Sequence, residues 1–172
     1  TNDPIDLTGY RLTKKVSSGT QSNLIASMSQ VINPNSYLLL SHTNYVGSVT
    51  TDLTYSTSSV TADNVVILYS DAGITVIDKV GFGTPFESEI APFITDPTAG
   101  QSIRRINNQD TDNNSVDFEL LQVSAPKNSS IVLATPTSSP TSSPTSSPEP
   151  TIIATSAPTS TPIQTPIETI SP

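Results

Sequence analysis

The stretch that decides the fold reads Asn64-Val-Val-Ile-Leu-Tyr-Ser-Asp-Ala-Gly73, followed by Ile74-Thr-Val-Ile-Asp-Lys-Val-Gly-Phe-Gly83. Each half holds a run of β-branched and apolar residues, and the Asp-Ala-Gly between them is a turn signal, so we expect a β-hairpin. Val65 to Tyr69 is uninterrupted and predicts a strand buried on both faces. Asp78 and Lys79 interrupt the second run, which predicts a strand nearer a sheet edge.

Short runs of the same kind occur on both sides of this hairpin, separated by turn residues. We expect extended segments at residues 5–12, 24–32, 37–40, 53–55, 103–106 and 116–123. No sustained 3.6-residue apolar period lies between capping residues, so we predict no helix. Short strands at near-regular spacing are typical of a β-sandwich, and we expect a single antiparallel one over about residues 3–127. Its predicted core comprises Leu7, Leu12, Leu38, Leu40, Val66, Leu68, Val76, Val80, Ile103 and Phe118.

The charge and composition exclude several functions. The net charge is −8, and no basic stripe interrupts the acidic body, so we expect no nucleic-acid partner. The chain has no cysteine, which excludes disulfides and thiolate zinc sites. No apolar run is long enough to span a membrane, and no signal peptide opens the chain. Because it begins with Thr1, we expect a fragment of a longer protein.

The composition changes completely from Thr135 onward. Thr-Ser-Ser-Pro occurs three times in tandem, at residues 137–140, 141–144 and 145–148. Such a segment has too few large apolar groups to offset its ordering entropy. We therefore predict a body at residues 1–127 and a disordered Thr/Ser/Pro-rich linker or stalk at 128–172. Dense Ser and Thr beside Pro is also a composition that accepts O-glycans.

Six segments of the body follow one another in an order that resembles the lamin-tail domain, an immunoglobulin-like β-sandwich that bacteria carry on secreted and surface proteins. They are Ile5–Leu12, Asn35–Leu40, Asp52–Tyr55, Val66–Gly73, Gln101–Arg104 and Asp110–Phe118. The resemblance implies an immunoglobulin-like antiparallel β-sandwich that acts as a binding or spacer module. Members usually have one more strand before the position of Thr1. The resemblance therefore implies that the first strand is missing and that one sheet edge is unpaired.

One segment combines oxygen ligands at the close spacing that calcium loops use. These candidate ligands are Asp110, Asp112, Asn114 and Asp117. Compared with an EF-hand loop, Ser115 stands at the glycine position and Leu121 at the position of the bidentate acid. The alternative is an Asx-rich turn whose side chains bond nearby backbone amides, and the sequence favours that alternative. Apart from this possible calcium, we expect no cofactor.

The proline-rich loop at residues 84–99 is the other candidate site. Its large apolar residues include Phe86 and Phe93, which we predict as a ligand-binding pair because loops on rigid scaffolds commonly carry function. The alternative, which the sequence favours, is that Phe86, Ile90, Phe93 and Ile94 fold back over an open end of the sandwich.

Three basic side chains have simpler interpretations. His42 is the only histidine, and with no partner at a defined spacing it is expected to be a surface residue. Arg104 and Arg105 are adjacent, so in a strand they point to opposite faces. We expect one of them to pair with Asp78 or Asp117.

The sequence therefore predicts a protein that is not an enzyme. We expect a non-catalytic extracellular or cell-surface module that contacts protein or glycan partners and is displayed on a Ser/Thr/Pro-rich stalk. Two alternatives stay open. One is an accessory domain of a secreted hydrolase, a nuclease or phosphatase, whose catalytic part lies outside this chain. The other is a structural spacer.

Overall fold

The structure is a computed structural model that describes residues 3–131. The chain divides into two units, Thr1–Pro136 and Thr137–Pro172, and the second lies outside the described residues. The predicted disordered tail therefore lies outside them from residue 132 onward. The strands are β1 (Ile5–Asp6), β2 (Arg11–Lys15), β3 (Gln21–Ile25), β4 (Val31–Ile32), β5 (Leu40–His42), β6 (Leu53–Tyr55), β7 (Val65–Ser70), β8 (Thr75–Gly81), β9 (Ser102–Arg105) and β10 (Phe118–Leu121).

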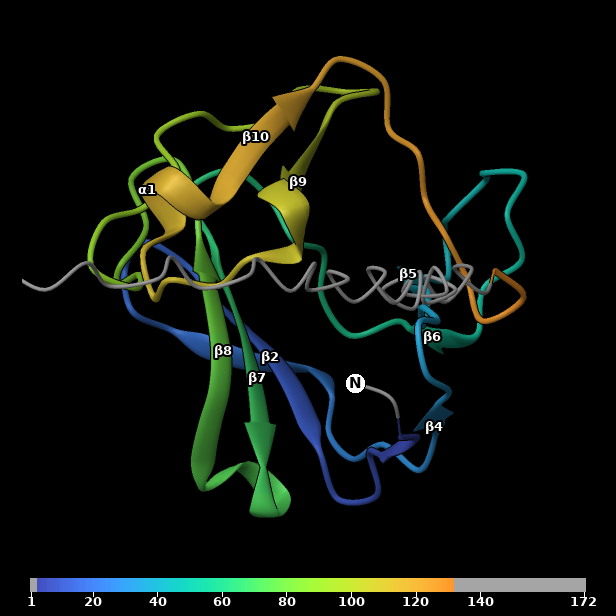
Figure 1. Cartoon of the computed structure of the whole chain (residues 1–172). Helices are drawn as coiled ribbons and strands as arrows, with labels where there is room; N and C mark the ends of the chain where they lie inside the picture. The colour runs from blue at the N-terminus through green and yellow to red at the C-terminus, as the bar shows by residue number, and fades with distance from the viewer. Residues whose placement is uncertain (1–2, 132–172) are drawn as a thin grey trace, which may run out of the picture. The chain divides into compact units, whose positions relative to one another are not determined.

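The prediction of an all-β fold is confirmed. The largest sheet is antiparallel with strand order β3-β2-β7-β8 (Figure 1). The uninterrupted apolar run forms β7, which has a neighbour on both sides. The run broken by Asp78 and Lys79 forms β8 at the sheet edge. Both placements agree with the sequence, because a central strand needs apolar side chains on both faces and an edge strand does not.

The predicted hairpin joins β7 to β8 through the short 3-10 helix η1 (Asp71–Gly73). Asp71 has φ 51° and Gly73 has φ 96°, so two of the three turn residues occupy the left-handed region. The carboxylate of Asp71 accepts hydrogen bonds from the hydroxyls of Ser70 and Thr75 and ties the turn to both strands. Gly and Asp are residue types that tolerate this backbone conformation.

Three smaller sheets complete the body. β1 pairs with β4 and β9 pairs with β10, each antiparallel, while β5 and β6 are parallel. The parallel pair departs from the purely antiparallel sandwich that we expected. Its reason is the connection of residues 43–52, which leads the chain back to the start of β5, so that β6 runs in the same direction. The immunoglobulin-like arrangement stays a prediction.

The main core cluster lies on one face of the large sheet. Leu7, Ile25 and Met28 are its buried members. The partly buried residues packed against them are Tyr10, Leu12, Ile32, Leu38, Leu40, Leu53, Tyr55 and Leu68. Five predicted core residues are therefore in this cluster, namely Leu7, Leu12, Leu38, Leu40 and Leu68.

The opposite face of the sheet holds the most buried strand residues, which the sequence prediction missed. Val65 is 0% exposed and Ile67 is 1% exposed. Lys15 and Lys79 flank them in register on β2 and β8, and Glu87 bridges the two ammonium groups at 2.5 and 2.8 Å. Long charged side chains can shield buried apolar neighbours with their aliphatic parts while the charged ends stay in contact with water.

Other predicted core residues are less buried than expected. Val66, Val80, Ile103 and Phe118 are half-buried, and Val76 is 46% exposed. The prediction for Val76 was wrong, because it lies on the edge strand β8, whose first three residues are all exposed.

The prediction of no helix was also wrong at one place. Residues Asn114–Asp117 form a one-turn helix, α1, and the Oδ1 of Asn113 caps it by accepting from the amide of Ser115 at 3.2 Å. The expected strand at 116–123 therefore begins at Phe118. A second 3-10 helix, η2, spans Ile106–Asn108. Within residues 3–131, no helix has the length and apolar character needed to cross a membrane.

Candidate functional site

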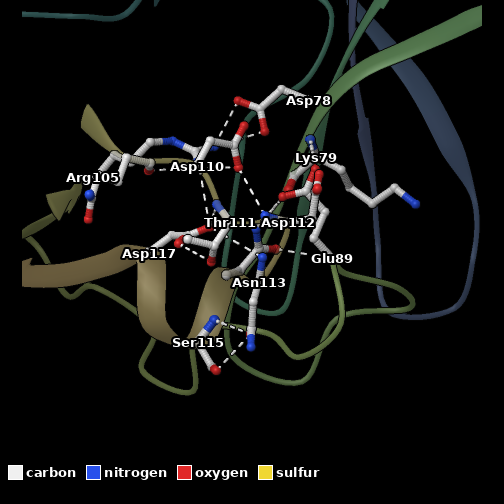
Figure 2. Close-up of polar contacts among 12 residues, drawn as sticks. Asp78, Lys79, Glu89, Arg105, Asp110, Thr111, Asp112, Asn113, Ser115 and Asp117 are labelled. Carbon is white, nitrogen blue, oxygen red and sulfur yellow. Dashed lines mark hydrogen bonds and ion pairs between the residues drawn. The ribbon is translucent and has the colours of Figure 1, made fainter. Parts of the chain in front are cut away.

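Arg105, at the end of β9, lies within a cluster of polar side chains that we call the polar centre (Figure 2). Its members are Asp78, Glu89, Arg105, Asp110, Asn114 and Asp117. Arg105 Nη2 donates to both carboxylate oxygens of Asp78 at 2.8 and 2.9 Å, and its Nη1 contacts Asp110 at 2.8 Å and Asp117 at 3.5 Å. The guanidinium also lies over the ring of Phe118, 4.7 Å from its centroid. Burial alone would lower the pKa of Arg105, but the charges of Asp78 and Asp110 raise it. The expected pairing of one arginine with Asp78 or Asp117 is confirmed.

Arg104, the adjacent arginine, has a different partner. It pairs with Glu119 across β9 and β10, and both side chains are substantially exposed. An exposed pair of this kind contributes little to stability. The two adjacent arginines thus have different roles, and only Arg105 belongs to the polar centre.

Asp117 closes the turn that precedes it. Its carboxylate accepts from the hydroxyl of Thr111 at 2.6 Å, from the amide of Thr111 at 3.0 Å and from the amide of Asn113 at 3.2 Å. The side chain is 2% exposed. The hydrogen bond from the Thr111 hydroxyl is the largest of the effects that hold the pKa of Asp117 below its usual value. Asp117 therefore serves as the acceptor around which residues 111–113 are wrapped.

Asn114 is completely buried and joins three segments. Its Oδ1 accepts from the amide of Gly81 at 2.7 Å, and its Nδ2 donates to the carbonyl of Lys79 and to Glu89 Oε2, each at 2.9 Å. Its backbone amide donates to the carbonyl of Glu89 at 3.3 Å. One side chain thus connects α1 to the end of β8 and to the loop at 84–99.

The four predicted calcium ligands are close in sequence but have separate tasks. Asp110 pairs with Arg105, Asn114 holds β8, and Asp117 holds residues 111–113. Asp112 is exposed and donates its backbone amide to Asp110 Oδ1 at 3.3 Å. The hydrogen bonds from nearby backbone amides to Asp110 and Asp117 are those of the Asx-rich turn that the sequence favoured, whereas the contacts of Asn114 reach distant segments. Calcium binding by the four residues stays a prediction.

A different trio of acids converges at the same place. Asp78, Glu89 and Asp110 each have one carboxylate oxygen within 4.8 Å of the others. Glu89 also accepts from the amide of Lys79 at 3.1 Å. Burial, followed by the charges of Asp78 and Asp110, raises the pKa of Glu89. Such an arrangement can attract a cation or a proton. Sequence reasoning missed it because the three residues come from β8, the 84–99 loop and the 110–117 turn.

The predicted ligand loop is divided between two environments. Phe86 is 55% exposed, with Lys15 Nζ 4.7 Å from its ring centroid. Phe93 is half-buried, forms a parallel β-bridge with Phe82, and exchanges backbone hydrogen bonds with Gly81 and Gly83. Both phenylalanines therefore pack on the body.

Ile90 behaves differently from the rest of this loop. It is 80% exposed, and its φ of 46° places a β-branched residue in the left-handed region. This conformation is strained for isoleucine. The residues on either side are fixed, because the carbonyls of Glu89 and Ala91 accept from the amides of Asn114 and Ser115. The sequence carried no signal for this conformation.

His42 has contacts that fit a structural role. Its Nδ1 accepts from the amide of Asn44 at 3.1 Å, and its ring packs edge-on against Tyr55 at 5.6 Å between centroids. It is half-buried, so it is less exposed than the predicted surface position.

No family model matches this chain, and neither does any curated protein or solved structure. The resemblance to the lamin-tail domain therefore stays a prediction.

Proposed function

We propose that this chain is a non-catalytic binding module of immunoglobulin-like type, displayed outside the cell on its Thr/Ser/Pro-rich C-terminal segment. We further propose that it contacts a protein partner through Ile90 and the adjoining face of α1. The observation that carries the proposal is the exposed, strained conformation of Ile90. A strained residue persists only when its surroundings determine it, and such residues concentrate at functional sites.

The surroundings of Ile90 support a preorganised contact surface. Asn114 and Ser115 hold the backbone on both sides of it, and Val116, the next residue of α1, is 59% exposed. A fixed apolar side chain loses little conformational entropy on binding, so its buried area contributes efficiently to affinity. Exposed aliphatic residues favour a protein partner, because glycans are recognised mainly through polar and aromatic groups.

Display is tested on the producing cells. Antibodies against the body should label intact cells before they are permeabilised. Labelling that requires permeabilisation would contradict an extracellular location.

Binding is tested with the purified full chain on an array of extracellular proteins. Ile90→Gly should weaken binding to any partner found at least tenfold and should leave the melting temperature unchanged or higher, because glycine tolerates φ 46°. Ile74→Gly is the matched control, since Ile74 is 83% exposed and adjoins η1 at the opposite end of β8 from Gly81. Equal binding by wild type and Ile90→Gly would rule out this surface.

The accessory-domain alternative rests on the lamin-tail resemblance. It predicts a nuclease or phosphatase domain encoded in the same gene. Hydrolysis of single-stranded DNA or p-nitrophenyl phosphate by the purified chain itself would overturn the non-enzyme proposal.

A further inference from the structure

Two adjoining hollows on the body share Tyr37 and Asn108 as lining residues. The first hollow has a volume of about 220 Å³ and is also lined by residues of the turn at 33–36. The second has a volume of about 310 Å³ and is also lined by Arg104 and Lys127. Ligand sites in proteins have volumes of about 300 to 1,000 Å³, so the two hollows together are large enough for a small ligand.

The first hollow is lined by asparagine side chains that are held out by two turns. In one turn the amide of Ser36 donates to the carbonyl of Asn33 at 3.2 Å, and Asn35 has φ 53°. In the other, Asn108 ends η2 with φ 56°. Among residues 3–131, the carboxamides of Asn33, Asn35 and Asn108 form no hydrogen bond. A carboxamide both accepts and donates, as a hydroxyl group does, so this hollow matches a ligand that is rich in hydroxyl groups.

The second hollow has a positive character although the net charge of the chain is −8. Lys127 Nζ donates to the hydroxyl of Tyr37 at 3.2 Å and lies 4.7 Å from the centroid of its ring. Lys127 forms no ion pair with an acid of residues 3–131, whereas Arg104 is paired with Glu119. No acid of the described residues lines either hollow. One cation is therefore left uncompensated, which favours a ligand with a single negative charge.

Tyr37 adds an aromatic surface to these polar groups. Sugar rings present C–H groups on their faces, and these groups pack against aromatic rings, whose π faces carry partial negative charge. Sugar acids combine such a face with hydroxyl groups and one carboxylate. Sulfated polymers and nucleic acids also carry negative charge, but the net charge of −8 repels a polyanion far more strongly than a single carboxylate.

We propose that the two hollows form a binding site for a short saccharide that carries one carboxylate, such as a uronic acid or a sialic acid. The carboxylate pairs with Lys127, the sugar ring packs against Tyr37, and the hydroxyl groups bond to the carboxamides of the first hollow. The site shares no residue with the proposed contact surface at Ile90, so this inference does not depend on the proposed function.

An array of short oligosaccharides tests the proposal with the purified full chain. The probes end in glucuronic acid, galacturonic acid or sialic acid, and each is printed beside the neutral sugar that lacks the carboxylate. We expect at least one acidic probe to bind about tenfold more tightly than its neutral counterpart. Lys127→Gln should remove this preference, and Lys127→Arg should keep it because the charge is retained. Equal affinity for acidic and neutral probes in wild type would overturn the proposal, as would no binding to any acidic probe at millimolar concentration.

Asn107 and Asn108 offer a matched pair of variants. Both are exposed and left-handed, with φ 51° and 56°, but only Asn108 lines the hollows. Glycine tolerates this backbone conformation, so both variants should stay folded. Asn108→Gly should weaken binding of the best acidic probe about tenfold, because it removes a carboxamide that lines both hollows. Asn107→Gly should bind as wild type does.

Two outcomes of these titrations would overturn the placement of the site. One is equal affinity of Asn107→Gly and Asn108→Gly for the best acidic probe. The other is loss of saccharide binding in Ile90→Gly, whose substitution lies outside both hollows. Unchanged saccharide binding by Ile90→Gly is the expected result, and it separates this site from the proposed protein contact.

Discussion

Two parts of this molecule are held together by different physics. Around β7, stability comes from hydrocarbon removed from water, with Val65 and Ile67 enclosed between β2 and β8. Around Arg105, it comes from directed hydrogen bonds and charge pairs among α1, β8 and the 110–117 turn (Figure 2). Burial of hydrocarbon is itself insensitive to pH and salt, although Lys15, Glu87 and Lys79 cover this region with charged groups. The second region depends on protonation and on the correct placement of single atoms.

The difference also separates stability from function. Hydrophobic burial is insensitive to direction, so it fixes strands in a sheet but not the orientation of a loop. The polar centre fixes orientation, because Asn114 holds Glu89, Ser115 holds Ala91, and the two together determine how Ile90 is presented. A polar cluster whose groups are all hydrogen-bonded can specify a single conformation.

The largest effect is expected in the hydrocarbon region. Ile67→Ala should reduce the free energy of unfolding by about 3 to 4 kcal/mol, because it leaves a cavity in place of a fully enclosed side chain. Ile77→Ala is the matched control on β8, where Ile77 is 49% exposed, and should cost less than about 1 kcal/mol. Urea denaturation measures both. Equal losses would mean that β7 is not the centre of the core.

The next largest effect is expected from the polar centre. Asn114→Ala removes three side-chain hydrogen bonds at 2.9 Å or less and leaves the amide of Gly81 and the carbonyl of Lys79 without them. The expected loss is about 3 kcal/mol. Asn113→Ala removes the cap of α1 together with the hydrogen bond from the Ser115 hydroxyl to the same oxygen, and it should cost about 1 kcal/mol. If the two variants unfold at the same urea concentration, the contacts of Asn114 stabilise the fold no more than a single helix cap does, and this prediction is wrong.

The hydrocarbon region was largely predictable from the sequence. The run at 65–69 and the broken run at 74–80 gave the central strand, the edge strand and the turn between them, because β-branched residues and turn residues act locally. What could not be predicted was which face of β7 is more deeply enclosed. An uninterrupted apolar run has no alternation, and the cover comes from Glu87, which lies in a distant loop.

The polar centre was predictable only in part. The pairing of Arg105 was expected, and so was the Asx-rich character of the 110–117 turn. The clamp made by Asn114 was not, because its partners at Gly81 and Glu89 are far away in sequence. The left-handed conformation of Ile90 runs against the local preference of isoleucine and results from these tertiary contacts.

Acid should weaken the polar centre through Asp117. The folded-state pKa of Asp117 is lowered, so its contribution to stability is complete above its unfolded value near 3.8 and is lost as the pH falls through the folded value. Asp117→Asn keeps the shape but not the charge, so the variant should be less stable at pH 7 and should approach wild type at pH 2. Glu119→Gln, in the exposed pair with Arg104, is the control. If the free energy of unfolding of wild type and of Asp117→Asn changes in parallel from pH 7 to pH 2, the Asp117 carboxylate does not contribute to the pH dependence of stability.

The smallest effect concerns calcium, and it can sharpen the comparison most. Millimolar calcium should raise the melting temperature of the full chain relative to a chelator, because a ligand that binds only the folded state stabilises it. For a dissociation constant near 1 mM, about 10 mM calcium gives roughly 1.4 kcal/mol. The predicted set of Asp110, Asp112, Asn114 and Asp117 requires that Asp112→Asn abolish the shift and that Asp78→Asn preserve it. Loss of the shift in Asp78→Asn alone would instead assign the ion to the carboxylates of Asp78, Glu89 and Asp110, which lie within 4.8 Å of one another. An unchanged melting temperature in wild type would mean that neither set of residues binds calcium. Among the described residues, the carboxylates of Asp78, Asp110 and Asp117 would then be neutralised by Arg105.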